Sequence, residues 1–304
     1  MVSKASASAR RIEEVLQTQD DQPVLSPEEV SAPSGPEFIR FEHVNFRYTG
    51  RDASPADSAS SPGSATQPGA PAEDHTPALT LEDISFSLER GKSLGIIGPT
   101  GCGKSTILHL LLRFYDAQEG GVYLDGRDVR TYEKDELRRR FGVVFQNDTV
   151  FRQTLRENIA FGRCLTDERL AEAAGDAMFG EFLEAQPEGL DFTADIKGAN
   201  LSGGQKQRLL ISRALAGRPE VLVLDDSSSA LDYRTDAALR ASLHRSYTDS
   251  TLLMVAQRVS SVQGLSQILV MDEGRIIGAG THDELMRTCP YYRETCEAQM
   301  GALA

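Results

Sequence analysis

The sequence predicts an α/β fold whose main sheet is mostly parallel. Short apolar segments, each suited to a buried strand, recur at residues 93–97, 221–224, 251–255 and 267–271. The last three each follow a stretch with helical periodicity, and the first precedes a glycine-rich turn and a helical stretch at 104–114. Apolar strands that alternate with helices pair in parallel and carry helices on both faces.

The N-terminal residues have the pattern of a short amphipathic helix. Ala9, Ile12, Val15 and Leu16 fall at helical spacing, with charged residues on the other side. From the pattern alone, this segment is either a frayed N-terminal helix or the end of a longer element.

Two segments before residue 80 have the composition of linkers. Residues 20–37 contain four prolines, and residues 51–77 contain five more and no Val, Ile, Leu or Phe. Such segments cannot bury enough apolar surface to offset the entropy lost on ordering. We therefore predict a linker at 20–37 and a flexible insertion at 51–77, which is either tolerated or functional.

The flanks of the insertion predict a small antiparallel sheet. Residues 38–46 and 79–88 alternate apolar and polar side chains, as strands with one buried face do. Residues 154–185 are rich in Ala, Glu and Leu and show no strand pattern, so they predict a helical insert.

The composition is globular and the charge disfavours nucleic acid as a partner. Of 304 residues, 40% are apolar and 25% charged, and 32 Lys and Arg against 45 Asp and Glu leave a formal net charge of −13. No run of about 18 apolar residues is present, so we expect no membrane-spanning segment. The four cysteines lack the paired spacing of a zinc site.

Residues 98–106, GPTGCGKST, fit the pattern GxxxxGK[ST] between a strand and a helix. Glycines let backbone N–H groups face inward as an anion nest, and the helix begins with its positive dipole end toward a phosphate. Lys104 adds a charge for the β- and γ-phosphates, and Ser105 offers a hydroxyl to Mg²⁺. The predicted phosphate-contacting residues are Gly98, Thr100, Gly101, Cys102, Gly103, Lys104, Ser105 and Thr106.

Two further motifs support nucleotide chemistry. The apolar segment at 221–224 ends in Asp225 and Asp226; an Asp at a strand end can hold magnesium-bound water, and the next one is placed to contact an attacking water. Residues 201–208, LSGGQKQR, open a helix with Ser202 as its N-cap, which makes a second anion site at a helix N-terminus.

Together these motifs resemble the nucleotide-binding domain of ABC transporters of the exporter kind. The resemblance covers about residues 38–300, the insertion excepted. It implies a RecA-like P-loop NTPase core, an antiparallel β-subdomain and an inserted helical subdomain at about 150–217, with ATP and Mg²⁺ as cofactors. It also implies that two such domains pair head to tail, each ATP lying between the P-loop of one and the signature turn of the other.

The resemblance assigns roles to further residues. Tyr48 matches the aromatic residue that stacks on adenine, and Gln146 matches the glutamine that touches Mg²⁺ and links to the membrane domain. Asp232 ends the D-loop, residues 228–232, which crosses the dimer interface. Residues 154–162, including Asn158, match the segment near the coupling helices of the transmembrane domain. The signature residues placed on the partner's ATP are Ser202, Gly203, Gly204 and Gln205.

The N-terminal pattern also resembles the cytosolic end of an exporter's last transmembrane helix. On this basis residues 1–19 are expected to be a remnant of that extension, and the chain to be a soluble fragment of a half-transporter acting at the cytoplasmic face of the membrane.

Two catalytic positions depart from the family pattern. Asp226 stands where Glu is usual, and Gln257 stands where His usually contacts the γ-phosphate. Gln cannot take up a proton at neutral pH. A milder departure is Ile196, where exporters often carry an acidic residue.

These departures beside an intact signature predict a heterodimeric exporter. This chain's own site would hydrolyse ATP slowly or not at all, while its signature completes a competent site on a different partner chain. The alternatives are an ATP-dependent dimerisation clamp and a homodimeric transporter ATPase. A soluble ABC ATPase acting on DNA or ribosomes is disfavoured, because basic surfaces and coiled-coil inserts are missing.

Overall fold

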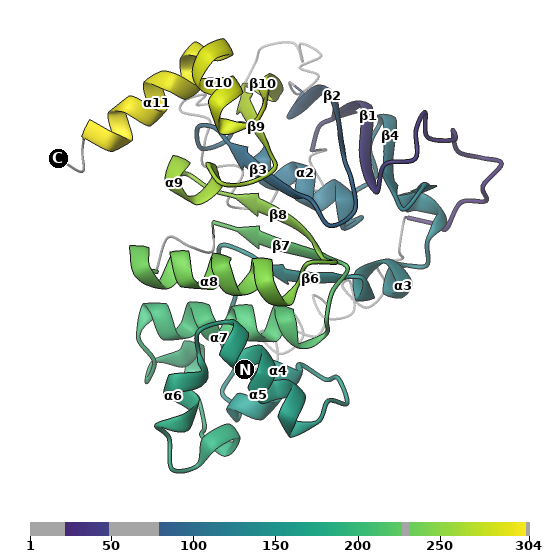
Figure 1. Ribbon diagram of the computed structural model, residues 1–304. Coiled ribbons are helices and arrows are strands. Elements are labelled where there is room, and N and C mark those ends of the chain that lie inside the picture. Colours follow the sequence, from purple (N-terminus) through teal and green to yellow (C-terminus); the bar gives the residue numbers. More distant parts are fainter. Residues whose placement is uncertain (1–21, 49–78, 227–230, 302–304) are drawn as a thin grey trace, which may run out of the picture.

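The computed structural model describes residues 22–48, 79–226 and 231–301, and the following statements concern those residues (Figure 1). The predicted N-terminal helix, the predicted insertion at 51–77 and residues 228–230 of the predicted D-loop lie outside them. In the part of the chain that is described, no helix combines the length and apolar character needed to cross a bilayer.

The main sheet has six strands, and five of them are parallel. Its order is β10 (Arg275–Gly280), β9 (Gln267–Asp272), β3 (Ser93–Ile97), β8 (Thr251–Val255), β7 (Val221–Asp225) and β6 (Phe141–Val144). Only the edge strand β10 runs antiparallel to its neighbour. The predicted α/β fold with a mostly parallel sheet is therefore confirmed.

The five parallel strands are largely buried on both faces, which explains why they are mostly apolar, whereas the edge strand β10 is more exposed. Alternate residues of β7 enter different clusters: Val221 and Val223 face the side of α2 (Lys104–Leu111) and α3 (Lys134–Arg139), whereas Leu222 and Leu224 face the other side. That other side is covered by helices of the second half of the chain, including α8 (Tyr233–Ser246) and α9 (Val259–Val262).

A second sheet of four antiparallel strands lies on the α2 side. Its order is β2 (Leu81–Leu88), β1 (Ile39–Phe46), β4 (Glu119–Leu124) and β5 (Arg127–Asp128). The predicted antiparallel pairing of the two segments that flank the insertion is confirmed, since β1 pairs with β2. β4 and β5 carry no strand pattern in the sequence, because β4 begins with a Glu-Gly-Gly run and β5 has only two residues.

Helices occupy the segment between β6 and β7 (Figure 1). They are α4 (Leu155–Ala160), α5 (Asp167–Asp176), α6 (Gly180–Glu184) and α7 (Gly203–Ala216), with 3₁₀ turns at Gly189–Asp191 and Ile196–Gly198. Hydroxyl side chains cap three of these helices: Thr154, Thr166 and Ser202 each accept a hydrogen bond from a first-turn N–H group. The chain ends with α10 (His282–Thr288) and α11 (Pro290–Gly301).

Residues 22–37 have no helix or strand, as expected of a linker, but they are docked on the domain. The guanidinium of Arg113, which is fully buried, donates to the carbonyl oxygen of Pro23 at 2.5 Å. The N–H of Leu25 donates to the carbonyl oxygen of Arg130 at 2.9 Å. Composition did not predict this docking, because backbone groups rather than apolar side chains make these contacts.

Candidate functional site

Three adjacent parallel strands bring the predicted site residues to one edge of the main sheet. The glycine-rich loop follows β3, Asp226 follows β7, and Gln257 follows β8, which lies between the other two strands. Because the carboxyl ends of parallel strands meet at the same sheet edge, Gln257 emerges between the loop and the Asp pair.

Two glycines in the loop after β3 lie where a side chain would clash with neighbouring atoms. Gly103 is the N-cap of α2 at φ 97°, a left-handed conformation that side chains disfavour, and a Cβ there would lie 2.6 Å from Leu81 Cδ2. At Gly98 a Cβ would lie 2.2 Å from the carbonyl oxygen of Met271. The loop therefore wraps tightly, and α2 begins at Lys104, as predicted.

Lys104 directs its ammonium group back over this loop. Its Nζ donates to the carbonyl oxygens of Gly98 at 2.9 Å and Pro99 at 2.7 Å, and the side chain is largely buried. Cys102 is also buried, with its Sγ 3.9 Å from Lys104 Nζ, and burial raises the pKa of its thiol. Thr100 lies at the exposed tip of the loop.

Ser105 and Asp225 form a pair at the floor of the site. The Ser105 hydroxyl donates to Asp225 Oδ2 at 2.9 Å. Asp225 is almost fully buried, and this burial raises the pKa of its carboxyl despite the opposing hydrogen bond from Ser105. A cation bound here would offset that electrostatic penalty.

The structure brings together the three residues predicted to be catalytic. Asp226 Oδ2 accepts from Gln257 Nε2 at 2.9 Å and lies 3.4 Å from Gln146 Nε2. The Asp226 backbone is left-handed at φ 47°, and its N–H donates to the carbonyl oxygen of Val255 at 2.9 Å. Burial raises the pKa of the Asp226 carboxyl, while Lys104 and Arg258 oppose the rise.

Tyr48 lies beside the first turns of α2. Its hydroxyl is 3.1 Å from both Thr106 Oγ1 and His109 Nδ1, and its ring meets Tyr115 edge to face with centroids 5.1 Å apart. His109 and Tyr115 were not among the predicted site residues. His109 stands three residues after Thr106 on a predicted helix, so helical spacing alone places these two side chains on one face. No comparable pattern indicates Tyr115.

The second predicted anion site is built separately. Ser202 and Gln205 form a capping box at the start of α7: the Ser202 hydroxyl accepts from the Gln205 N–H at 3.3 Å, and Gln205 Oε1 accepts from the Ser202 N–H at 2.7 Å. Gly203 and Gly204 are the first two residues of the helix. Asp232 is the N-cap of α8, where it accepts from the Thr235 N–H at 2.9 Å.

The oxygen ligands at the loop after β3 fit magnesium nucleotide. Mg²⁺ is held in proteins by one or two carboxylates together with substrate phosphates and water. Ser105 and Asp225 supply a hydroxyl and a carboxylate, and Gln146 adds an amide near Asp226. Within residues 22–48, 79–226 and 231–301, no group of three or more His, Cys, Asp or Glu is placed to hold a metal ion.

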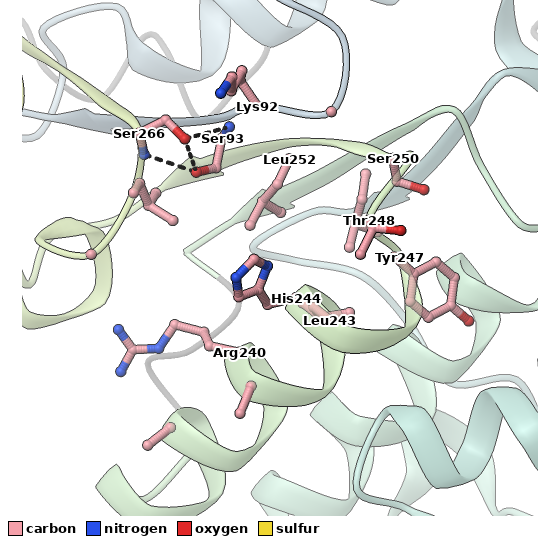
Figure 2. A pocket seen from close by; sticks show the side chains of 16 residues that line it. Lys92, Ser93, Arg240, Leu243, His244, Tyr247, Thr248, Ser250, Leu252 and Ser266 are labelled. Atoms are coloured by element: carbon pink, nitrogen blue, oxygen red, sulfur yellow. Dashed lines mark hydrogen bonds between the residues drawn. The ribbon is translucent and has the colours of Figure 1, made fainter.

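A cavity of about 520 Å³ lies at the opposite edge of the main sheet. Its wall includes Ser93, Leu252 and Ser266, where β3, β8 and β9 begin, together with Arg240 and His244 of α8 (Figure 2). A strand of five residues is about 16 Å long. This cavity is therefore too far from the glycine-rich loop to take part in phosphate chemistry.

Comparisons with known proteins agree on one family. The family model of ABC transporters matches residues 81–229. An ATP-dependent lipid A-core flippase of Photobacterium profundum is 42% identical over 228 residues, 74% of this chain and 39% of the flippase. A probable multidrug resistance ABC transporter ATP-binding/permease protein of Bacillus subtilis is 36% identical over 98% of this chain and 47% of that protein.

A solved structure of a bacterial Atm1-family ABC exporter with ATP bound is similar over 98% of this chain and 48% of that chain. The TM-score is 0.77 and the sequence identity 29%. The chain spans less than half the length of these relatives.

Proposed function

Because the chain belongs, through residues 81–229, to the ABC transporter family, we propose that it is the ATP-binding and ATP-hydrolysing domain of an exporter. The convergence of Lys104, the Ser105–Asp225 pair and the Asp226–Gln257 pair at one sheet edge carries this proposal. The nucleotide-binding domain would extend over residues 38–300, with the helical subdomain at about 150–217, the linker at 20–37 and the insertion at 51–77.

Different residues at this sheet edge would bind different parts of ATP. The backbone of residues 98–106 and the ammonium of Lys104 would bind the phosphates, and Tyr48 would stack on the adenine. Ser105, Asp225 and Gln146 would hold Mg²⁺, which neutralises phosphate charge when bound. Lys104 would then exchange a loop carbonyl for a phosphate oxygen.

Asp226 and Gln257 support a weak catalytic site. Asp226 would orient the attacking water, but Asp is one methylene shorter than the Glu usual in the family. Gln257 would donate one Nε2 hydrogen to the γ-phosphate while the other stays on Asp226 at 2.9 Å, but its amide cannot take up a proton. Loss of one well-placed catalytic donor lowers the rate by about 10²- to 10³-fold, so we propose slow or no hydrolysis at this site.

The intact signature turn supports a partner with a second nucleotide-binding domain. Ser202–Gln205 lies on α7 and forms its hydrogen bonds within its own turn. In a head-to-tail dimer it would complete a competent site on a different chain, with Asp232 near the interface. A homodimer, or a clamp that closes on ATP with little turnover, remains the alternative.

The surface around α4 supports contact with transmembrane-domain coupling helices. A hollow of about 660 Å³ is lined by residues between positions 151 and 170, among them Phe151 and Phe161, which are 43% and 55% exposed. Buried Asn158 fixes this segment by accepting from the Phe151 N–H at 3.0 Å. The domain would thus act at the cytoplasmic face of a membrane as part of a transporter.

Turnover measured against protein concentration tests this proposal. The native chain is compared with an Asp226→Glu/Gln257→His variant. If the native chain stays near background and the variant turns over, rising more than linearly, the native site is degenerate and its partner is a different chain. If the native chain itself rises in that way, a homodimer is favoured and the asymmetric assignment is wrong.

Nucleotide binding tests the placement of the phosphates separately. A Lys104→Ala variant should lose most of its affinity for ATP, because the buried ammonium is the cation that faces the loop. Unchanged affinity in that variant would refute the placement.

A further inference from the structure

The helix α11 is hydrogen-bonded to the loop that contains Gln257. The side-chain amide of Gln299, near the end of α11, makes two hydrogen bonds to the backbone after β8. Its Oε1 accepts from the Val259 N–H at 2.8 Å, and its Nε2 donates to the carbonyl oxygen of Gln257 at 2.9 Å. One amide therefore brackets the backbone on both sides of Arg258.

The helix that carries this amide is itself anchored. Tyr292 is fully buried, and its hydroxyl lies 2.9 Å from His282 Nδ1 on α10. Cys296, one turn further along α11, is also buried, in the apolar cluster on the α8 and α9 side of the main sheet. α11 packs against α9, the helix that begins at Val259 (Figure 1). Gln299 thus projects from a helix that is anchored by buried side chains.

The bracketed segment leads directly to the catalytic carboxylate. Gln257 binds Gln299 through its carbonyl oxygen and Asp226 through its side chain at 2.9 Å. A backbone held at residues 257 and 259 fixes where the Gln257 side chain starts. Positioning by packed neighbours within about 0.5 Å is what a transition-state contact requires.

From this geometry we propose that Gln299 is a positioning residue for Gln257, so that the C-terminal helix sets how well the site distinguishes ATP from ADP. The inference rests on the proposed function, in which Gln257 faces the γ-phosphate. ADP lacks this phosphate, so its binding depends on the glycine-rich loop and Tyr48 but not on the bracket.

Two variants of the full chain separate the two hydrogen bonds. Gln299→Met has a side chain of similar length and removes both. Gln299→Glu keeps an oxygen that accepts from the Val259 N–H but loses the donor to the Gln257 carbonyl. Glu297→Ala, an exposed position on the same helix, is the matched control.

The first measurement is amide exchange at Val259, which requires no nucleotide. One hydrogen bond is worth about 1 kcal/mol, so Gln299→Met should accelerate exchange about 5- to 10-fold, while Gln299→Glu and Glu297→Ala should stay within about twofold of the native chain. Unchanged exchange in Gln299→Met would show that the bracket does not exist in solution.

The second measurement is the affinity for MgATP and MgADP of the same proteins. Gln299→Met and Gln299→Glu should weaken ATP binding about 5-fold and leave ADP binding within about twofold, because both variants free the Gln257 carbonyl. An equal loss for both nucleotides, or none, overturns the positioning role and leaves Gln299 as an anchor of α11. Absence of all nucleotide binding refutes the proposed function instead, and the exchange result still decides whether the bracket forms.

Discussion

Replacing Arg213 by Ala should destabilise the protein more than any comparable change of a surface arginine. Arg213 projects from α7 and is buried. Its guanidinium donates to the carbonyl oxygens of Asn158 at 2.9 Å and Thr149 at 3.1 Å, and lies 4.6 Å from the ring centre of Phe161. It therefore ties the helix that follows the signature turn to the segment after Gln146.

The magnitude follows from the groups that lose their donor. Each buried carbonyl left without a donor costs about 1–3 kcal/mol. The variant no longer carries the desolvation penalty of a buried charge, which offsets part of this cost, so we expect the free energy of unfolding to fall by about 3 kcal/mol. Burial lowers the pKa of Arg213, because the charged guanidinium loses hydration in the interior. For a domain of this size the loss corresponds to a fall in Tm of about 6–12 °C.

Thermal and urea unfolding of the purified chain measure this difference. Arg218→Ala is the matched control, because its side chain is 68% exposed and pairs with Glu172 at 3.0 Å. The control should change the free energy of unfolding by no more than about 0.5 kcal/mol. A loss below about 1 kcal/mol for Arg213→Ala, or one equal to the control, would refute the assignment of Arg213 as a structural tie.

Three further predictions concern the nucleotide site. Burial raises the folded-state pKa of Asp225, so ionisation of this carboxyl opposes folding as the pH rises above its ordinary pKa of 3.8. Asp225→Asn should therefore raise Tm at pH 7 and give no gain in stability near pH 3, which melting at several pH values measures. The same variant should lose magnesium-dependent ATP binding in a binding titration. Gly103→Ala should lower the free energy of unfolding by about 1–2 kcal/mol because of the positive φ, and further because the new Cβ contacts Leu81. Gly126→Ala, at φ 72° with open space around the Cβ, should show only the first loss. Equal Tm shifts in the two variants would contradict the contact with Leu81. Tyr48→Phe keeps the ring and should change ATP affinity less than about threefold, whereas Tyr48→Ala should weaken it about tenfold; equal effects in a binding titration would contradict stacking.

Much of the site was predictable from sequence because its motifs are local. The glycines at 98, 101 and 103, the helix start at Lys104 and the cap at Ser202 each follow from the backbone chemistry of a few consecutive residues. The parallel strands were predictable because burial on both faces leaves a continuous apolar run.

Other elements gave no such signal. β6 has four residues, β4 begins with a Glu-Gly-Gly run, and half of β10 is glycine or alanine. These strands are stabilised by pairing with distant segments rather than by their own periodicity. The docking of residues 22–37 on Arg113 was missed for a related reason, since its acceptor is a backbone carbonyl that every sequence carries.

The sequence by itself determined the fold class and the chemistry of each turn, because propensity, capping and glycine geometry act over a few residues. Only the tertiary structure decided which turns meet. Gln146 and Asp226 are 80 residues apart, and Gln257 is a further 31 along the chain. The position of β8 between β3 and β7 brings Gln257 to Asp226, and the packing of α11 brings Gln299 to the backbone of Gln257. These contacts arise from the order of strands and the packing of helices, which no local pattern encodes.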